Sequence, residues 1–407
     1  MSRKRVLFLQ PGLEPHGGAR AVAAWIVQAL KDDFDLTVLT KAPVNWAPFN
    51  HYYGTSIRSE EVSILTLHPA LRVLVGLHPN PYNAHPAAFL MRMCRRIRHR
   101  YDLVVCAASE EADLGGPGIL YVHYPYLAYV WEKYEDCAGR PLLEQLAALI
   151  RGKVRPFMIS SGYSLDRMKQ NRILVNSDWT GEIFRRSYGT PTETLYPPVT
   201  ASPERLPWRD RENAFVTIGR LTSPKRFEWI AGLIARLRQR HGDLSLHVVG
   251  TREGAFERRY YQRLRRLERE NSTWMRLHED LSREELLRLL GRVRYGIHAK
   301  VDEHFGIAPA ETLMAGCITF VHDSGGQVEI VDRDPRLCFS SQDDAAAKID
   351  RVLADSSLQS SLLKLVSDRS AMFSTESFTR KFRELVRSYE HSSEQQHPQL
   401  YQSASTR

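Results

Sequence analysis

The stretch EHFGIAPAE, residues 303–311, places the carboxylates of Glu303 and Glu311 at the two ends of a small, apolar segment. The preceding run YGIHAK has the pattern of a buried strand, and Pro309 suits the first turn of a helix. We therefore predict a strand, a loop that holds Glu303, and a helix that holds Glu311. A carboxylate beside so apolar a helix needs a partner or water, which makes both side chains candidates for binding.

Short β-type runs alternate with helical patterns on both sides of the chain's midpoint. The runs are RVLFLQ, LTVLT, VSILTL, DLVVCAA, GILYVHY and RILVNS in the first half, and AFVTIGR, SLHVVG, YGIHAK and CITFVHD in the second. This alternation predicts an α/β fold of two Rossmann-like, doubly wound parallel domains. Open sheets of this kind bind ligands at the carboxyl ends of their strands, so we expect the chemistry in a central cleft that both domains face.

The chain of 407 residues exceeds what one hydrophobic core usually supports. The polar, proline-bearing segment TASPERLPWRDREN predicts a linker over residues 200–212. It separates an N-terminal acceptor domain, residues 1–199, from a C-terminal donor domain, residues 213–375. We expect a C-terminal helix over residues 376–390 that returns to the first domain, and a disordered tail over 391–407.

The composition excludes several classes of protein. No apolar run approaches the roughly 20 residues of a membrane span, and the apolar stretch near the start is too short for a signal peptide, so we expect a cytoplasmic protein. The five cysteines never occur in CxxC spacing, which argues against a disulfide framework and a zinc site. The net charge of +9 indicates an anionic partner: a phosphorylated small molecule, a lipid surface or, ranked low, nucleic acid.

Gly17 and Gly18 lie in the loop HGGAR between the first predicted strand and helix. Bare backbone amides and the positive end of a helix can meet a phosphate or a sugar hydroxyl there. The loop does not read GxGxxG, which weakens a dehydrogenase interpretation. A tight turn that needs positive φ explains the glycines equally well.

Arg220 and Lys225 follow the strand AFVTIGR in a loop that then enters a helix. Two cations at the carboxyl end of a strand can hold a diphosphate and neutralise the charge that grows on it as it leaves. Simple solvent exposure is the alternative, and the glycine-rich loop of the other domain favours binding.

The backbone amides of Phe305, Gly306 and Ile307 open the helix that follows Glu303, and a helix N-terminus favours an anion. Each flanking carboxylate can accept two hydroxyl protons from a sugar diol. Two carboxylates around an anion site suit a ligand with phosphate in the middle and sugars on both sides. The segment therefore predicts a nucleotide sugar.

In this order and at these separations, HGGAR, GRLTSPKR and Glu-x7-Glu resemble the family 4 retaining glycosyltransferases of the GT-B fold, over about residues 5–385. YVHYPY, VNSDWTGEIF, YPPV and EHFGIAPAE are similar to segments of the GDP-mannose-dependent α1,2-mannosyltransferases of lipid-linked oligosaccharide synthesis. Residues 41–100 and the linker show no such likeness.

The resemblance implies a role for each candidate residue. Glu311 would bind the ribose hydroxyls, and Glu303 would bind a hydroxyl of the transferred sugar. The remaining roles are the diphosphate for Arg220 and Lys225, the reacting sugar for His123, the phosphate and acceptor for Gly17 and Gly18, and the sugar pocket for Gly325, Gly326 and Gln327. A packed His123 and a plain turn at the glycine pair are the alternatives.

The resemblance also implies the reaction: retaining transfer of a hexose, with mannose from GDP-mannose favoured, to a glycan or lipid-linked acceptor. The implied route has no covalent intermediate, because the leaving diphosphate takes the acceptor's proton. No cofactor and no metal is expected, since no Asp-x-Asp pair falls in the proposed cleft. The alternatives are transfer from a UDP-sugar to a small molecule or polysaccharide, a nucleotide-sugar epimerase or phosphorylase, and a basic RNA-binding protein without catalysis.

Two local expectations complete the interpretation. In VNSDWTGEIF, the side chain of Ser177 or Asp178 is expected to cap the following helix. Residues 70–77 and 87–100 combine apolar and basic side chains and could lie on an anionic membrane surface. A core helix with a solvated basic face is an equal alternative.

Overall fold

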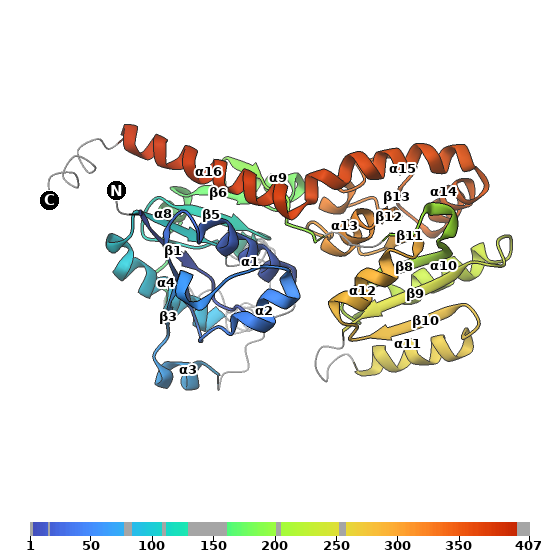
Figure 1. Cartoon of the computed structure of the whole chain (residues 1–407), viewed down its shortest axis with the longest axis horizontal. Coiled ribbons are helices and arrows are strands. Elements are labelled where there is room, and N and C mark those ends of the chain that lie inside the picture. The colour runs from blue at the N-terminus through green and yellow to red at the C-terminus, as the bar shows by residue number, and fades with distance from the viewer. Residues whose placement is uncertain are drawn as a thin grey trace, which may run out of the picture. The chain divides into compact units, whose positions relative to one another are not determined.

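The computed structural model describes residues 3–14, 17–76, 84–107, 111–128, 161–200, 205–251 and 258–396 (Figure 1). The chain divides into two compact units. The first unit comprises Met1–Asn176, Thr180–Pro197 and Glu376–Arg407, and the second comprises Ser177–Trp179 and Pro198–Thr375. The short segment Ser177–Trp179 thus groups with the second unit, although we expected residues 1–199 to form one domain.

The first unit is built on a parallel sheet whose strands lie in the order β3-β2-β1-β4-β5-β6-β7. Its strands are β1 (Arg5–Leu9), β2 (Asp35–Thr40), β3 (Val62–Thr66), β4 (Leu103–Cys106), β5 (Ile119–Val122), β6 (Arg172–Val175) and β7 (Thr192–Thr194). Its helices are α1 (Gly18–Leu30), α2 (Trp46–Tyr53), α3 (Pro69–Gly76), α4 (Ala84–Ile97), α8 (Leu165–Lys169), α9 (Asp178–Tyr188) and α16 (Thr375–Gln396).

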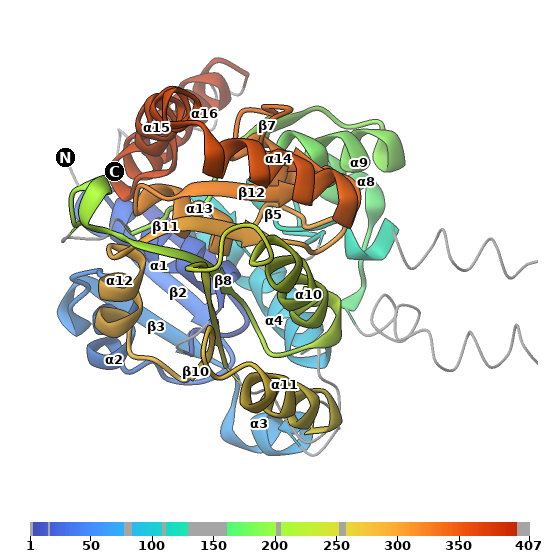
Figure 2. The ribbon, with the colours of Figure 1, turned by 90° about the vertical axis from the view of Figure 1, so that its right-hand side faces the viewer.

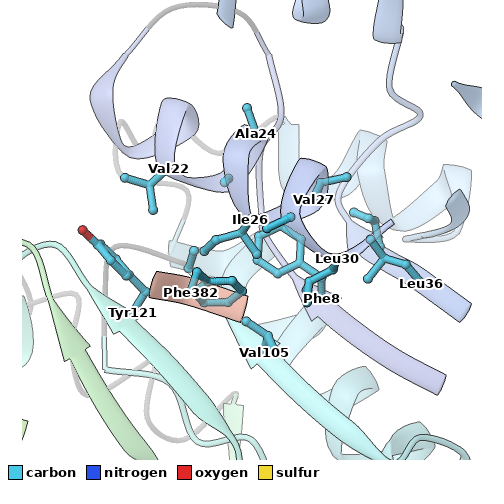
Figure 3. Packing of buried hydrophobic residues seen from close by; sticks show 14 of the residues in the cluster. Phe8, Val22, Ala24, Ile26, Val27, Leu30, Leu36, Val105, Tyr121 and Phe382 are labelled. Atoms are coloured by element: carbon cyan, nitrogen blue, oxygen red, sulfur yellow. The ribbon is translucent and has the colours of Figure 1, made fainter. Parts of the chain in front are cut away.

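The core of the first unit forms where α1 packs on the sheet (Figure 3). Val22, Ile26 and Leu30 recur at helical spacing on α1, so one apolar face of the helix is buried. Phe8 of β1 and Phe382 of α16 pack in the same cluster. The C-terminal helix therefore contributes to the core of the first unit.

Helix α16 continues through Gln396, which corrects our expectation of a disordered tail from His391 onward. The segment 391–396 contains neither glycine nor proline, so nothing in it interrupts a helix that is already formed. The rest of the predicted tail, residues 397–407, lies outside the described residues.

The second unit repeats the design, with parallel strands in the order β10-β9-β8-β11-β12-β13. The strands are β8 (Glu212–Ile218), β9 (Ser245–Gly250), β10 (Met275–Glu279), β11 (Val293–His298), β12 (Ile318–His322) and β13 (Cys338–Phe339). The helices are α10 (Phe227–Leu237), α11 (Arg258–Glu270), α12 (Arg283–Leu290), α13 (Ile307–Met314), α14 (Gln342–Ala354) and α15 (Ser356–Ser370), with single 3-10 turns η4 (Ser223–Lys225), η5 (Gly326–Glu329) and η6 (Ala371–Phe373). Figure 2 faces this unit and shows α10 and α11 beside its strands.

Two parallel, doubly wound sheets confirm the predicted α/β fold class. In each unit the strand order reverses beside the first strand, between β1 and β4 and between β8 and β11. Ligands of open α/β sheets bind near such switch points, at the carboxyl ends of the strands. The loops after β8, β11 and β12 therefore form the natural place for a site in the second unit.

Helix α4 is a core helix with a basic outer face. Its side chains Leu90, Met91 and Cys94 are buried in the first unit. Arg95 lies 3.6 Å from the buried carboxylate of Asp113, so part of its positive charge is already neutralised. In the part of the chain that the structure describes, none of the helices combines the length and the apolar character that crossing a bilayer requires.

Candidate functional site

Glu303 lies in the loop between β11 and α13, and three basic side chains surround its carboxylate. Its Oε2 accepts a hydrogen bond from Lys225 Nζ at 2.7 Å and lies 3.2 Å from His298 Nε2. Lys300 Nζ lies 3.6 Å from the other oxygen, Oε1. The first carboxylate of the Glu-x7-Glu segment thus has the partners that its apolar surroundings demand.

Burial alone would raise the pKa of Glu303, but the hydrogen bond from His298 and the charges of Lys225 and Lys300 outweigh it. The pKa of this carboxyl is therefore held well below its ordinary value. Burial lowers the pKa of His298 more than the bond to Glu303 raises it, and Lys225 adds to the lowering. At neutral pH the pair is an anionic carboxylate beside a neutral imidazole.

The Glu303 cluster carries more positive than negative charge. Lys225 and Lys300 contribute two positive charges, and Glu303 contributes one negative charge. Arg220 lies two residues after the end of β8 and is exposed to solvent. A surplus of cations at the carboxyl end of a parallel sheet suits an anionic ligand.

Arg226 holds the Lys225 loop in place. It has φ 58°, in the left-handed region, and its guanidinium donates to the carbonyl of Ala299 at 3.4 Å. The same guanidinium lies 4.8 Å from the centre of the Trp229 ring, a cation–π distance. These contacts tie the turn that carries Lys225 to the loop after β11, so they help to set the Lys225–Glu303 pair.

Gly325 and Gly326 let the loop after β12 approach the Glu303 loop closely. The amide of Gly326 donates to the carbonyl of Glu303 at 2.8 Å. A Cβ at Gly325 would lie 2.3 Å from that carbonyl, and one at Gly326 would lie 2.2 Å from the carbonyl of His304. Close packing of the two loops therefore requires glycine at both positions. This explains the glycine pair more specifically than the plain turn that we considered as an alternative.

Gln327 is fully buried behind the two glycines. Its Nε2 donates to the carbonyls of Lys300 at 2.7 Å and Ser324 at 3.0 Å. Its Oε1 has no hydrogen-bond partner among the described residues. A buried acceptor without a partner is uncommon, so this oxygen remains a candidate for a hydroxyl donor.

The N-terminus of α13 supplies backbone groups only. Gly306, the residue before the helix, has φ 101° and has no side chain that could cap it. The side chain of Phe305 is buried against Phe373, with ring centres 5.8 Å apart. Of the predicted donor-binding residues Phe305, Gly306 and Ile307, the first can therefore offer a ligand only its backbone.

Glu311 lies within α13, where Arg283 at the start of α12 donates to its Oε1. The two side chains are 12% and 15% exposed, so the pair is largely shielded from water. A carboxylate has about four acceptor positions, which leaves room for a diol beside the arginine. No local sequence pattern indicates Arg283, because its partner lies 28 positions away.

The predicted residues of the first unit follow strands β1 and β5. Gly17 is the residue before α1 and has φ 112°, the positive φ that a tight turn needs, and its carbonyl accepts from Tyr53 Oη at 3.2 Å. Gly18 is the first residue of that helix. His123 follows β5, and its ring packs 5.1 Å from that of Tyr121. His16 lies outside the described residues.

The structure thus brings Lys225, Glu303, Gly325 and Gln327 together in the second unit, and it places Gly17, Gly18 and His123 in the first. It adds His298 and Lys300, which sequence analysis passed over. A signal was available: YGIHAK ends a buried strand with a histidine and a lysine.

The expected side-chain cap of α9 stays a prediction, and the structure adds a partner for the helix N-terminus that the sequence did not indicate. The amides of Asp178 and Trp179 donate to the carboxylate of Glu329 at 2.9 and 3.0 Å, and Ser177 Oγ donates to the carbonyl of His304. A carboxylate at a helix N-terminus satisfies the free amides and the helix dipole. The partner lies about 150 positions away in the sequence, so no local pattern could reveal it.

The described residues contain no group of three histidine, cysteine, aspartate or glutamate side chains that could hold a metal ion. Cys94, Cys106, Cys317 and Cys338 are buried, and none of these four is in a disulfide. Cys137 lies outside the described residues.

Residues 199–364 match the family described as glycosyl transferases group 1. The chain is 26% identical over 235 residues to GDP-Man:Man(3)GlcNAc(2)-PP-Dol alpha-1,2-mannosyltransferase of Dictyostelium discoideum, which covers 53% of this chain and 46% of that protein. It is 27% identical over 248 residues to the protein of the same name from Neurospora crassa, with 52% and 44% covered. The chain therefore spans about half the length of the curated relatives it matches.

Among solved structures, the chain is similar to Anabaena HepE in complex with UDP, with a TM-score of 0.65 and 15% identity over 94% of this chain and 100% of that one. It is equally similar to WaaG, a glycosyltransferase involved in lipopolysaccharide biosynthesis, with a TM-score of 0.65 and 15% identity over 93% and 99%. At this identity the likeness shows the fold. The second unit of this chain is therefore a glycosyl transferases group 1 domain, and the chain has the two-unit GT-B fold of glycosyltransferases.

Proposed function

We propose that this protein is a retaining glycosyltransferase of family 4 that transfers a hexose from a nucleotide sugar. Mannose from GDP-mannose is the favoured donor, and a glycan or lipid-linked sugar is the acceptor. The observation that carries the proposal is the cation-rich cluster around Glu303, in a domain that matches the glycosyl transferases group 1 family.

The donor binds in the second unit. Arg220 and Lys225 hold the diphosphate, and the amides at the start of α13 add donors for its oxygens. Glu311 accepts the ribose hydroxyls, and Glu303 accepts a hydroxyl of the transferred sugar. Gly17, Gly18 and His123 of the first unit keep the roles that the resemblance implies.

The chemistry follows from the state of Glu303. Its lowered pKa makes its carboxylate a weak base, and the basic side chains of Lys225 and His298 hold it in place. It therefore serves as a hydrogen-bond acceptor, neither as nucleophile nor as general base. The departing diphosphate takes the acceptor's proton on the same face of the sugar, and catalysis consists of positioning and charge stabilisation.

The choice of guanine and mannose rests on the curated relatives, whose names specify GDP-mannose as donor. A UDP-sugar donor with a small-molecule or polysaccharide acceptor is the second candidate, and the likeness to UDP-bound HepE concerns the fold alone. A non-catalytic RNA-binding protein is the third, and it predicts indifference to Glu311→Ala.

A donor screen by thermal shift tests the proposal. GDP, UDP and ADP are compared, each with its matching nucleotide sugars, at equal concentration. A ligand at 100 times its dissociation constant stabilises the protein by about 2.7 kcal/mol, which is readily measured. Guanine nucleotides should stabilise most. Stronger stabilisation by UDP or ADP would overturn the GDP-mannose assignment, and no stabilisation by any nucleotide would overturn the glycosyltransferase proposal.

A further inference from the structure

His298 is a buried histidine whose ring faces Glu303. It ends β11 and is only 2% exposed, in a strand whose other buried residues include Tyr295 and Ile297. An aliphatic side chain would fill such a position without burying a polar ring, which costs free energy unless the ring is hydrogen-bonded. The bonding partner in the structure is Glu303 Oε2 at 3.2 Å, so the ring's contact with this carboxylate offsets that cost.

The ring donates without adding charge. Lys225, Lys300 and Glu303 are the charged groups that face it. Burial and the two lysines lower the pKa of the ring more than Glu303 raises it, so the imidazole is neutral at pH 7. Because Nε2 faces a carboxylate, it carries the proton, and Nδ1 does not. A neutral donor can keep its hydrogen bond to Glu303 even when a lysine turns to another partner.

A neutral donor is important because Lys225 has two partners, Glu303 and, in the proposed function, the diphosphate. Lys225 bonds to the same oxygen of Glu303 as His298, and in the proposed function it also serves the diphosphate. When Lys225 turns to the diphosphate, Glu303 Oε2 loses that bond. His298 has no such competing partner in the proposed site.

We propose that His298 is a positioning residue, the neutral donor that holds the Glu303 carboxylate toward a hydroxyl of the transferred sugar while Lys225 engages the diphosphate. The inference rests on the proposed function. A positioning role can be told apart from mere filling of the core, because it predicts an effect on binding of the sugar and none on binding of the nucleotide alone.

His298→Leu keeps the bulk and removes the donor, whereas His298→Gln keeps an N–H near the position of Nε2. Calorimetry measures the dissociation constants of GDP and of GDP-mannose for each variant. We expect the ratio of the GDP-mannose to the GDP dissociation constant to rise about tenfold in His298→Leu, the loss of one hydrogen bond to a charged group. His298→Gln should restore most of the wild-type ratio.

The pH profile of turnover is the second readout. Lys225 from η4, His298 from β11 and Lys300 from the loop all favour the ionised form of Glu303. Removing the His298 donor should raise the pKa of Glu303 and move the acid limb of kcat to higher pH. His298→Gln should move it back. His278→Leu is the matched control, since His278 on β10 bonds to His247 at 2.9 Å instead of to Glu303.

An unchanged ratio and acid limb in His298→Leu, or a Gln variant no better than Leu, would overturn the inference. Nitrogen-15 NMR of the wild-type ring tests it without any variant, because a ring protonated on Nδ1 alone at pH 7 cannot donate to Glu303 and would overturn it too. A wild-type protein that binds none of the nucleotide sugars would overturn the proposed function, and the inference with it.

Discussion

Lys225 donates to Glu303 across 2.7 Å, although 78 positions separate the two residues in the sequence. One belongs to the turn after β8 and the other to the loop after β11, and these strands are neighbours in the sheet. The pair links Lys225, which is proposed to bind the diphosphate, with Glu303, which is proposed to bind the transferred sugar. Donor binding therefore exchanges one ionic partner of Lys225 for another, which limits the desolvation that binding requires.

The first prediction concerns charge stabilisation without a metal. Lys225→Ala should lower turnover by roughly two orders of magnitude or more, because it removes a cation from the departing diphosphate. Neither magnesium nor manganese should rescue it. Wild-type activity should survive excess EDTA in the same assay, and Lys364→Ala, on α15, is the control for loss of a lysine. Complete loss of wild-type activity in EDTA, restored by manganese, would contradict the assignment.

Glu303 and Glu311 should affect different parts of the donor. Glu311→Ala should weaken binding of bare GDP by about 1 to 3 kcal/mol, since it removes a ribose acceptor and leaves the largely buried Arg283 without this partner. Glu303→Ala should reduce kcat more than it reduces GDP affinity. Calorimetry with GDP and steady-state kinetics separate the two effects. Equal losses of affinity for bare GDP in the two variants would contradict this division of roles.

His304 should make the protein sensitive to acid. Burial lowers its pKa to about 4, whereas an unfolded histidine titrates near 6.5. Between these values the unfolded chain binds the proton and the folded one does not, so the free energy of unfolding falls as the pH drops from about 6.5 to about 4. The loss attributable to this ring is at most about 3 to 4 kcal/mol.

His304→Phe keeps a ring stacked near Trp179, whose centre lies 6.0 Å away, and removes the titration. Urea denaturation at pH 7.5 and 4.5 should show a smaller difference in the variant than in the wild type. His99→Gln, at an exposed position, should retain the wild-type difference. An equal difference in all three proteins would refute the assignment to His304.

The membrane prediction now rests on charge. The apolar face of α4 is buried in the core, so contact with a bilayer would use its exposed arginines Arg92 and Arg96, with Arg100 just after the helix. Flotation with anionic vesicles should show binding that salt weakens, and neutral vesicles should not bind. Replacing the three arginines by glutamine should abolish flotation without changing GDP affinity. Equal flotation of the variant would remove this surface from the proposal.

Most of the fold was predictable because α/β alternation is a local pattern. Each predicted β-type run corresponds to a strand, including the buried runs that became β1, β5 and β11. Strands β7, β10 and β13 were not predicted from the sequence. The strand β7 is three residues long and none of them is buried, and β13 has two residues, so neither carries a detectable pattern. MRLHE of β10 mixes exposed and buried positions with two charged residues.

The site, like the fold, was predictable from the sequence in part. The sequence by itself determined which groups were available: Glu303 and Glu311 at fixed spacing, Lys225 after a strand, and a proline in the first turn of α13. Only the tertiary structure decided their partners, which were Lys225 and His298 for Glu303, Arg283 for Glu311, and Glu329 for the amides of α9. Spacing and burial patterns are encoded within a few residues. An ion pair across 78 positions and an amide–carboxylate hydrogen bond across 151 positions depend instead on which elements become neighbours, and that is a property of the packed fold.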